Sequence, residues 1–131
     1  MTNWAIVGLG KIAHKFAQDI QKVEGARLWA VASTSQERAE AFAVKYGVRH
    51  AFGSYDLLLK CPDLHVVYIA TPHPLHTPLA IKYINAGLPV LVEKPWAMHT
   101  EEARRLALTA RRQGVFAMEA LWTRFIPLFE K

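Results

Sequence analysis

The feature that most constrains this chain is a short apolar run followed at once by a glycine-rich turn. Residues 4–7 read Trp-Ala-Ile-Val, and residues 8–13 read Gly-Leu-Gly-Lys-Ile-Ala. A buried strand that leads into Gly-x-Gly-x-x-Ala is typical of the turn that cradles the pyrophosphate of a dinucleotide. In such a turn Gly8 permits the tight bend, Gly10 lets the backbone approach a phosphate, and Ala13 leaves room for helix packing. The pattern alone is weak, because two glycines can also simply shape a loop.

The residues after the turn strengthen the dinucleotide interpretation. Ile12, Phe16, Ala17 and Ile20 recur at the spacing of one helix face, so a helix is predicted directly after the glycines. The N-terminus of that helix would offer unpaired N–H groups and a positive dipole end to the phosphates. We therefore assign cofactor binding to Gly8, Leu9, Gly10, Lys11, Ile12 and Ala13.

Strand and helix patterns alternate along the rest of the chain, which predicts an α/β fold with a parallel sheet wound by crossover helices. We expect about six strands in a doubly wound, Rossmann-type sheet, with the ligand crevice beyond the carboxyl ends of the strands. Ser35, Ser54 and Thr100 are expected to cap helices. Further strands are assigned to residues 28–32, 66–70 (counted as the fourth), 90–93 and 115–120. Helices are assigned to residues 36–46, from the cap at Ser54 through Lys60, between Pro78 and Gly87, and from the cap at Thr100 to a stop at Gly114.

Composition agrees with one packed domain of an enzyme. The chain has 131 residues, of which 52% are hydrophobic, enough for a sizeable core. No apolar run reaches the ~18 residues of a membrane span, and the first residues lack the pattern of a signal peptide. We therefore expect a cytoplasmic protein that does not bind membranes. The single Cys61 has no partner for an internal disulfide and no spaced Cys or His for a zinc site, so no metal is expected.

The formal net charge is +5, which raises the question of nucleic-acid binding. Lys and Arg are scattered, and the nearest thing to a cluster lies along one side of a predicted helix, which is ordinarily a solvated face. No stacking aromatic residues are interleaved with it, as single-strand binders require. We expect no nucleic-acid partner, and a mild positive field would suit an anionic dinucleotide. The residues of this cluster are Arg104, Arg105, Arg111 and Arg112.

The end of the second strand bears on the choice of cofactor. An NAD-selective site usually places Asp or Glu there to bind the ribose 2′-hydroxyl, but this chain has Ser33, Thr34 and Ser35. Hydroxyls can donate to a 2′-phosphate, and Arg38 in the next helical turn could pair with its charge. The sequence therefore predicts NADP in preference to NAD. The alternative is that the hydroxyls only form a loop and helix cap, with Arg38 solvated.

Two later strand ends carry residues suited to chemistry. Residues 70–76 read Ala-Thr-Pro-His-Pro-Leu-His, and the two prolines would stiffen a loop beneath a nicotinamide ring. Residues 93–95 read Glu-Lys-Pro. Desolvation of a lysine at a strand end lowers its pKa and allows proton exchange near neutrality. Lys94 is therefore the candidate catalytic residue, and a structural lysine paired with Glu93 is the alternative.

This ordered set of motifs resembles the Gfo/Idh/MocA oxidoreductases. Residues 119–125, Glu-Ala-Leu-Trp-Thr-Arg-Phe, are similar to the branch that contains dimeric dihydrodiol dehydrogenase and NADP-dependent xylose dehydrogenase. The resemblance implies that Lys94 contacts the reacting oxygen of a sugar, polyol or diol. His73 departs from the asparagine frequent in the wider family but suits the dihydrodiol branch. Further cofactor contacts are assigned to Ser33, Thr34, Arg38, Ala70, Thr71, Pro72, His73, His76, Glu93, Lys94, Trp122 and Arg124.

The same resemblance implies a second α/β domain that covers the nicotinamide, supplies substrate contacts and builds a homodimer or larger oligomer. We expect residues 1–120 to form the dinucleotide-binding domain and residues 121–131 to begin the crossing into a C-terminal domain that this chain lacks. The chain would then be the cofactor-binding half of an NAD(P)-dependent oxidoreductase and inactive alone. The alternative is a non-enzymatic dinucleotide-binding module or sensor.

Overall fold

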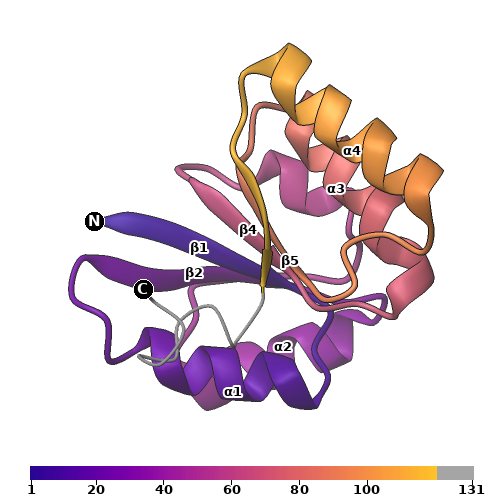
Figure 1. The fold of residues 1–131 in the computed structure, drawn as a ribbon. Coiled ribbons are helices and arrows are strands. Elements are labelled where there is room, and N and C mark those ends of the chain that lie inside the picture. Colours follow the sequence, from indigo (N-terminus) through magenta and orange to yellow (C-terminus); the bar gives the residue numbers. More distant parts are fainter. Residues whose placement is uncertain (121–131) are drawn as a thin grey trace, which may run out of the picture.

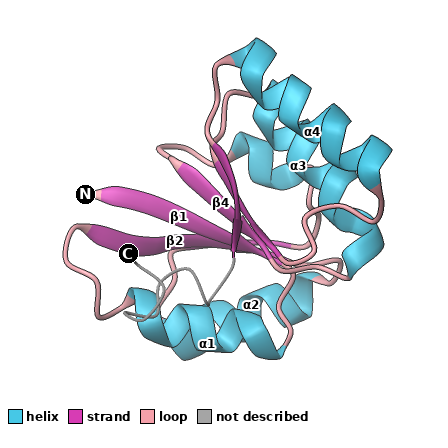
Figure 2. Cartoon of the chain, viewed as in Figure 1, coloured by secondary structure: helices cyan, strands magenta, loops and turns pink. Residues whose placement is uncertain are grey.

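The computed structural model of the protein describes residues 1–120. Strands and helices alternate through this range, as the sequence predicts (Figure 2). In chain order, the elements are β1 (Thr2–Val7), α1 (Lys11–Ile20), β2 (Ala26–Ala32), α2 (Gln36–Tyr46), β3 (His50–Phe52), β4 (Val66–Ile69), α3 (His76–Asn85), β5 (Val90–Glu93), α4 (Thr100–Gln113) and β6 (Ala117–Ala120), with single 3-10 turns at Leu57–Lys60 and His73–Leu75.

The six strands form one sheet in the order β3-β2-β1-β4-β5-β6. Every pair is parallel, including β1 with β2 and β1 with β4. Figure 1 shows α1 and α2 on one face of the sheet and α3 and α4 on the other. The predicted doubly wound parallel sheet is therefore confirmed. The strand order reverses between β1 and β4, and this is where a ligand crevice is expected in such a sheet.

Alternation along the strands divides the apolar side chains between two cores. Val67 and Ile69 of β4 pack with Tyr83 of α3, whereas Tyr68 between them packs in the cluster that contains Phe42 of α2. Successive strand residues point to opposite faces, so a strand buried on both sides must be apolar throughout. This explains the apolar runs at residues 4–7 of β1, 28–32 of β2 and 66–69 of β4.

Helix α2 begins and ends where the sequence predicts. The Ser35 hydroxyl accepts the N–H of Arg38 at 3.3 Å, and the helix ends at Gly47. The prediction for α4 was wrong in one respect, because His99 rather than Thr100 is the cap. The backbone of His99 is extended, and its ring nitrogen accepts the N–H of Glu102, which makes Thr100 the first helical residue.

Other elements also differ from the sequence prediction, since α3 begins at His76 rather than near Pro78 and β2 begins at Ala26 rather than Leu28. Ser54 does not cap a helix, because its hydroxyl accepts the N–H of Asp56 within a turn that precedes the 3-10 turn. Strand β6 starts at Ala117 because Val115 still donates to Ala110 at the end of α4. Strand β3 is a three-residue edge strand to which the sequence assigned no residues. No helix within residues 1–120 is long and apolar enough to cross a bilayer.

Candidate functional site

A cleft of about 490 Å³ lies at the carboxyl ends of β1, β2 and β4, at the switch point of the sheet. Most residues predicted to bind a cofactor line this cleft, although they come from four separate segments. Tyr55 and Leu75 also line it and were not predicted. The predicted residues that the cleft brings together are Gly8, Leu9, Gly10, Lys11, Ile12, Ser33, Thr34, Arg38, Ala70, Thr71, Pro72 and His73.

The two glycines of the turn have different structural roles. Gly8 has φ +90°, and a Cβ there would lie 2.7 Å from the nitrogen of Thr71 and 2.8 Å from the oxygen of Ala70. The fold itself therefore requires glycine at position 8, because the end of β4 passes directly against it. A Cβ at Gly10 would meet nothing within 4 Å. Position 10 thus leaves open space in the cleft, as the close approach of a phosphate requires.

The N-terminus of α1 faces this space without a side-chain cap. Gly10 is the cap residue, it makes no side-chain hydrogen bond, and the first turn holds no acidic residue. The first N–H groups of a helix have no partner within the helix, so those of Lys11 and Ile12 are available to an anion. Such an end, with its positive dipole, suits a pyrophosphate.

The chemistry of the cleft lining also fits an anionic dinucleotide. Among its described lining residues there is no carboxylate, and the charged side chains are those of Lys11 and Arg38. The Thr71 hydroxyl is buried without a hydrogen-bond partner within residues 1–120. A buried polar atom of this kind is costly unless a ligand or water satisfies it. The residues present therefore fit a bound NAD(P) group.

The segment predicted to distinguish NADP from NAD divides into two parts. Ser33 is 3% exposed, and its hydroxyl accepts the N–H of Ser35, which itself caps α2. Both hydroxyls accept local N–H groups, as the loop-and-cap alternative expects, and each retains an O–H that can donate. Thr34 and Arg38 are exposed and line the cleft. Ser33, Thr34 and Arg38 thus line the cleft together.

Tyr55 adds an aromatic side chain at the same end of the cleft. It is half-buried and its carbonyl oxygen accepts the hydroxyl of Tyr83 at 2.9 Å. Burial raises the pKa of Tyr55, and the positive charge of Arg38 acts in the opposite direction. Tyr55 lies three residues after the end of β3. It could have been predicted as a cleft residue only if that strand had been assigned from the sequence.

Lys94 lies on the turn that follows β5 and does not line the cleft. Its side chain is exposed, and the Lys94–Pro95 peptide bond is cis. The desolvation expected for a catalytic lysine is therefore not supplied by residues 1–120. Lys94 is placed at the carboxyl edge of the sheet, the edge at which the cleft also lies.

His76 links the cleft to the Lys94 turn. It is fully buried, with Nδ1 2.7 Å from the carbonyl oxygen of Pro95 and Nε2 2.8 Å from that of Thr71. Both partners are carbonyl oxygens, which only accept, so a neutral ring donates its single N–H to one of them. The sequence predicted that His76 contacts the cofactor; in the structure it does not line the cleft and lies between the turns at Thr71 and Pro95.

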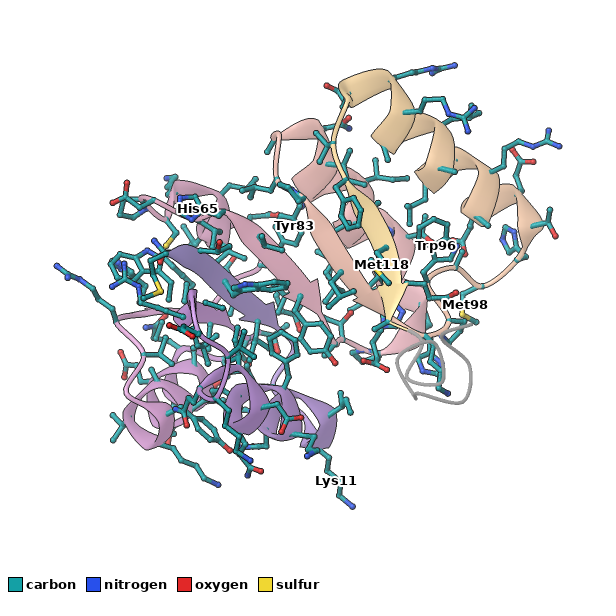
Figure 3. The ribbon with its side chains drawn as sticks, turned by 60° about the vertical axis from the view of Figure 1, so that its left-hand side comes forward. Lys11, His65, Tyr83, Trp96, Met98 and Met118 are labelled. Atoms are coloured by element: carbon teal, nitrogen blue, oxygen red, sulfur yellow. The ribbon has the colours of Figure 1, made fainter. Side chains whose placement is uncertain are left out.

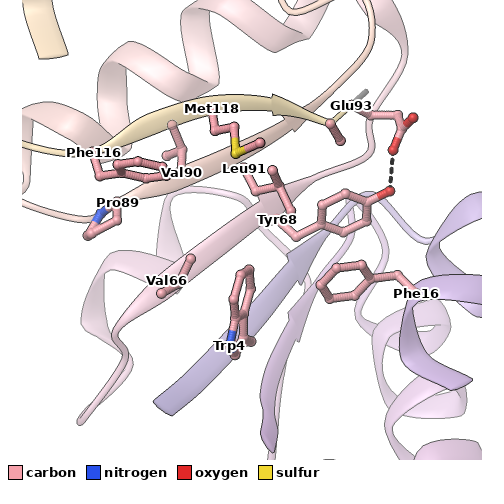
Figure 4. Close-up of a pocket in the computed structure, with 11 residues that line it drawn as sticks. Trp4, Phe16, Val66, Tyr68, Pro89, Val90, Leu91, Glu93, Phe116 and Met118 are labelled. Carbon is pink, nitrogen blue, oxygen red and sulfur yellow. Dashed lines mark hydrogen bonds between the residues drawn. The ribbon is translucent and has the colours of Figure 1, made fainter. Parts of the chain in front are cut away.

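Glu93 does not line the cleft and instead lines an apolar groove of about 440 Å³ (Figure 4). The Tyr68 hydroxyl donates to its carboxylate at 2.5 Å, and Phe16 stacks on the Tyr68 ring with centroids 4.0 Å apart. Burial, followed by the bond to Glu93, raises the pKa of Tyr68. The groove shares no lining residue with the cleft, and it is lined by Trp4, Phe16, Val66, Tyr68, Pro89, Val90, Leu91, Glu93, Phe116, Met118 and Ala120.

Three further predicted positions complete the comparison. Ala13 is fully buried among core residues, as its packing role requires, and does not line the cleft. Trp122 and Arg124 lie outside the described residues, as does the crossing predicted for residues 121–131. Within the described range, no group of three or more His, Cys, Asp or Glu side chains is placed to hold a metal ion.

Comparison with known proteins decides the family. The family described as "Oxidoreductase family, NAD-binding Rossmann fold" (GFO_IDH_MocA) matches residues 2–121. The chain belongs to the Gfo/Idh/MocA oxidoreductase family. The resemblance seen in the sequence motifs is thereby confirmed, and the fold identifies the matched part as the NAD(P)-binding Rossmann domain of that family.

Named relatives share this domain over nearly the whole chain. The chain is 43% identical over 129 residues to trans-1,2-dihydrobenzene-1,2-diol dehydrogenase of Mus musculus, covering 97% of this chain and 39% of that protein. An NAD binding oxidoreductase from Klebsiella pneumoniae superposes with a TM-score of 0.93 at 31% identity, covering 98% of this chain and 36% of the other. KijD10, a 3-ketoreductase from Actinomadura kijaniata in complex with TDP-benzene and NADP, superposes with a TM-score of 0.92 at 27% identity, covering 98% and 41%.

Proposed function

We propose that the cleft binds NADP(H) in preference to NAD(H), and that the whole protein transfers hydride between the nicotinamide and a diol, polyol or sugar-like substrate. The observation that carries this proposal is the cleft itself, which is cationic, free of carboxylates among its described residues and faced by an uncapped helix N-terminus. The name of the mouse relative supports a diol substrate. The neighbours' names include both cofactors, so the NADP preference rests on the cleft residues.

Each part of the cleft would hold one part of the cofactor. The N–H groups at the start of α1 and the open space at Gly10 would receive the pyrophosphate. Thr34 and Arg38 would bind the 2′-phosphate, since a guanidinium forms charge-assisted bonds with phosphate oxygens. The stiff turn of Pro72 and His73 would lie against the nicotinamide end.

The chemical step would use Lys94. When bound, the nicotinamide cofactor supplies hydride acceptance or donation. Lys94 would donate a hydrogen bond to the reacting oxygen of the substrate, stabilise the negative charge that develops on this oxygen, and transfer a proton to or from it. Because Lys94 is exposed within residues 1–120, we infer that residues beyond this range complete its surroundings. The cytoplasmic location and the homodimer stay predictions.

The cofactor preference is tested by calorimetric titration of NADPH and NADH into the protein. NADPH should bind more tightly, and Arg38→Gln should weaken NADPH binding about 10- to 100-fold, because a hydrogen bond to a charged group contributes about 1.5–3 kcal/mol. NADH binding should change little. Thr34→Asp should also weaken NADPH binding through charge repulsion. Arg104→Gln, an exposed change on α4, is the matched control, and equal affinities for the two cofactors would refute the preference.

The catalytic role is tested by Lys94→Met in the protein expressed from its complete reading frame. Turnover should fall by about 10² to 10⁴, the usual contribution of a positioned acid or base. Lys94→Arg should rescue little, because a guanidinium does not release its proton near neutrality. If Lys94 is only a structural lysine, turnover per folded molecule should stay nearly unchanged in Lys94→Met. A non-enzymatic binding module would show no turnover with or without Lys94. Melting temperatures of the same preparations give the folded fraction.

A further inference from the structure

The turn that carries Lys94 is held at its far end by a carboxylate from the neighbouring strand. Glu119 lies in β6, opposite Val92 of β5 in the parallel pairing. Its Oε2 accepts the backbone N–H of Trp96 at 2.9 Å. Figure 3 shows Trp96 beside the carboxyl end of β6. The Glu119 side chain thus reaches past the end of β5 and holds the residue that follows Lys94-Pro95.

The other side of the same turn is attached to α3. The Thr77 hydroxyl donates to the carbonyl oxygen of Trp96 at 3.2 Å, and Nδ1 of His76 lies 2.7 Å from the carbonyl oxygen of Pro95. The backbone of Trp96 is therefore held through its N–H from β6 and through its carbonyl from α3. The position of Lys94, whose side chain is exposed, depends on this backbone rather than on burial.

A second hydrogen bond from a backbone N–H to a carboxylate lies nearby, and it has a different structural role. The Glu102 carboxylate accepts the N–H of Met98, also at 2.9 Å, while the N–H of Glu102 donates to His99. These two bonds belong to the start of α4 and resemble a capping box, except that Glu102 accepts from Met98, the residue before the cap, rather than from His99. Glu119 sits in a strand and caps no helix, so its bond to Trp96 serves to join the strand to the turn. A bond to a carboxylate is stronger than one between neutral groups.

We propose that Glu119 is a positioning residue for Lys94. By holding the N–H of Trp96, it fixes the turn and sets where the ammonium stands relative to the cleft. This inference rests on the proposed role of Lys94. Glu119 itself touches neither the cleft nor the substrate in this scheme, and it acts only through the backbone of the turn.

The experiment compares Glu119→Ala, Glu119→Gln and the matched control Glu102→Ala in the protein expressed from its complete reading frame. Glu119→Ala should lower kcat about 10- to 100-fold, since a misplacement of about 1 Å can cost 10²-fold. The dissociation constant for NADPH should change by less than about threefold. Glu119→Gln keeps an acceptor oxygen and should recover most of the loss. Glu102→Ala should leave kcat unchanged.

Two further readouts separate positioning from general stability. Amide hydrogen exchange at Trp96 should accelerate in Glu119→Ala and stay unchanged in Glu102→Ala, whereas Met98 should show the reverse. In a Lys94→Met background, Glu119→Ala should cause no additional loss of kcat, because residues that act as one unit are not additive. If Glu119→Ala does not fold, Glu119→Met keeps the length of the side chain, removes the acceptor and is judged by the same criteria.

The outcomes distinguish this inference from the proposed function. Normal turnover of folded Lys94→Met would refute the catalytic role of the lysine, and the positioning role would fall with it. A large loss in Lys94→Met together with unchanged kcat in Glu119→Ala would overturn only the positioning role. The positioning role alone would also be overturned if Glu119→Ala reduced kcat equally with and without Lys94.

Discussion

The two glycines of the first turn should respond to alanine in opposite ways, although they are two residues apart in one motif. In Gly8→Ala the new Cβ would lie 2.7 Å from the backbone nitrogen of Thr71, and φ is +90°. A non-glycine residue at positive φ costs about 1–2 kcal/mol, and overpacking against backbone adds about 1–3 kcal/mol. The free energy of unfolding should fall by about 2–5 kcal/mol. For a domain of this size that is a drop in Tm of about 7–18 °C.

Gly10→Ala should leave the fold nearly intact and affect the ligand. Its Cβ would meet nothing within 4 Å, and φ of −85° with ψ of −162° is open to any residue. Replacing glycine by alanine at a cap position costs about 0.5–1 kcal/mol, so Tm should fall by less than about 4 °C. Because the Cβ would occupy the space assigned to the pyrophosphate, NADPH affinity should fall at least about tenfold.

Thermal unfolding without ligand and calorimetric titration of NADPH measure both effects on the same preparations. Gly8→Ala is measured below its own Tm, so that only folded protein is titrated. A Gly10→Ala protein that binds NADPH as tightly as the parent would refute the placement of the pyrophosphate over position 10. A Gly8→Ala protein with unchanged Tm would show that the end of β4 does not pass as close as described.

Two other predictions follow from side chains outside the cleft. Burial, followed by the charge of Asp63, raises the pKa of Cys61 to about 11 from a usual value of 9.0. Its alkylation by iodoacetamide at pH 8 should therefore be about 100-fold slower in the folded than in the denatured protein. Equal rates would contradict the burial of the thiol. Burial, followed by the charge of Lys45, lowers the pKa of His14. As the pH falls below 6.5, His14 is therefore protonated in the unfolded chain before it is protonated in the folded protein. The free energy of unfolding should accordingly decrease from pH 7.5 to pH 5.5. This decrease should be smaller in His14→Gln, measured by denaturant titration at both pH values, and an identical decrease in both proteins would remove His14 as its source.

Strong local patterns made the fold predictable. Strands β1, β2 and β4 are buried on both faces, so their apolar runs stand out, and the cap at Ser35 fixes the start of α2. Strand β3 was not assigned, because three half-buried residues at a sheet edge, His50–Phe52, carry neither an apolar run nor an alternation. The cap at His99 was not predicted, because the conformation of the loop after β5 decides which residue is the last extended one.

The candidate site was predictable only where a motif determines the backbone. The turn at Gly8 and Gly10 lies where the motif requires it. The bond that the Ser33 hydroxyl accepts could not be predicted from the sequence, because it depends on the conformation of the turn. The burial of His76 and the bond from Glu119 to Trp96 depend on how distant segments meet across the sheet. No local pattern encodes such contacts.

The central claim is that a dinucleotide binds across the switch point of the sheet. Its most direct test is the change in backbone amide chemical shifts when NADP⁺ is titrated into ¹⁵N-labelled protein. We expect saturable shifts at Gly8, Gly10, Ile12, Thr34 and Thr71, and no shifts around Met118 of the apolar groove. Shifts confined to the groove, or no saturable shifts at the switch point, would contradict the account.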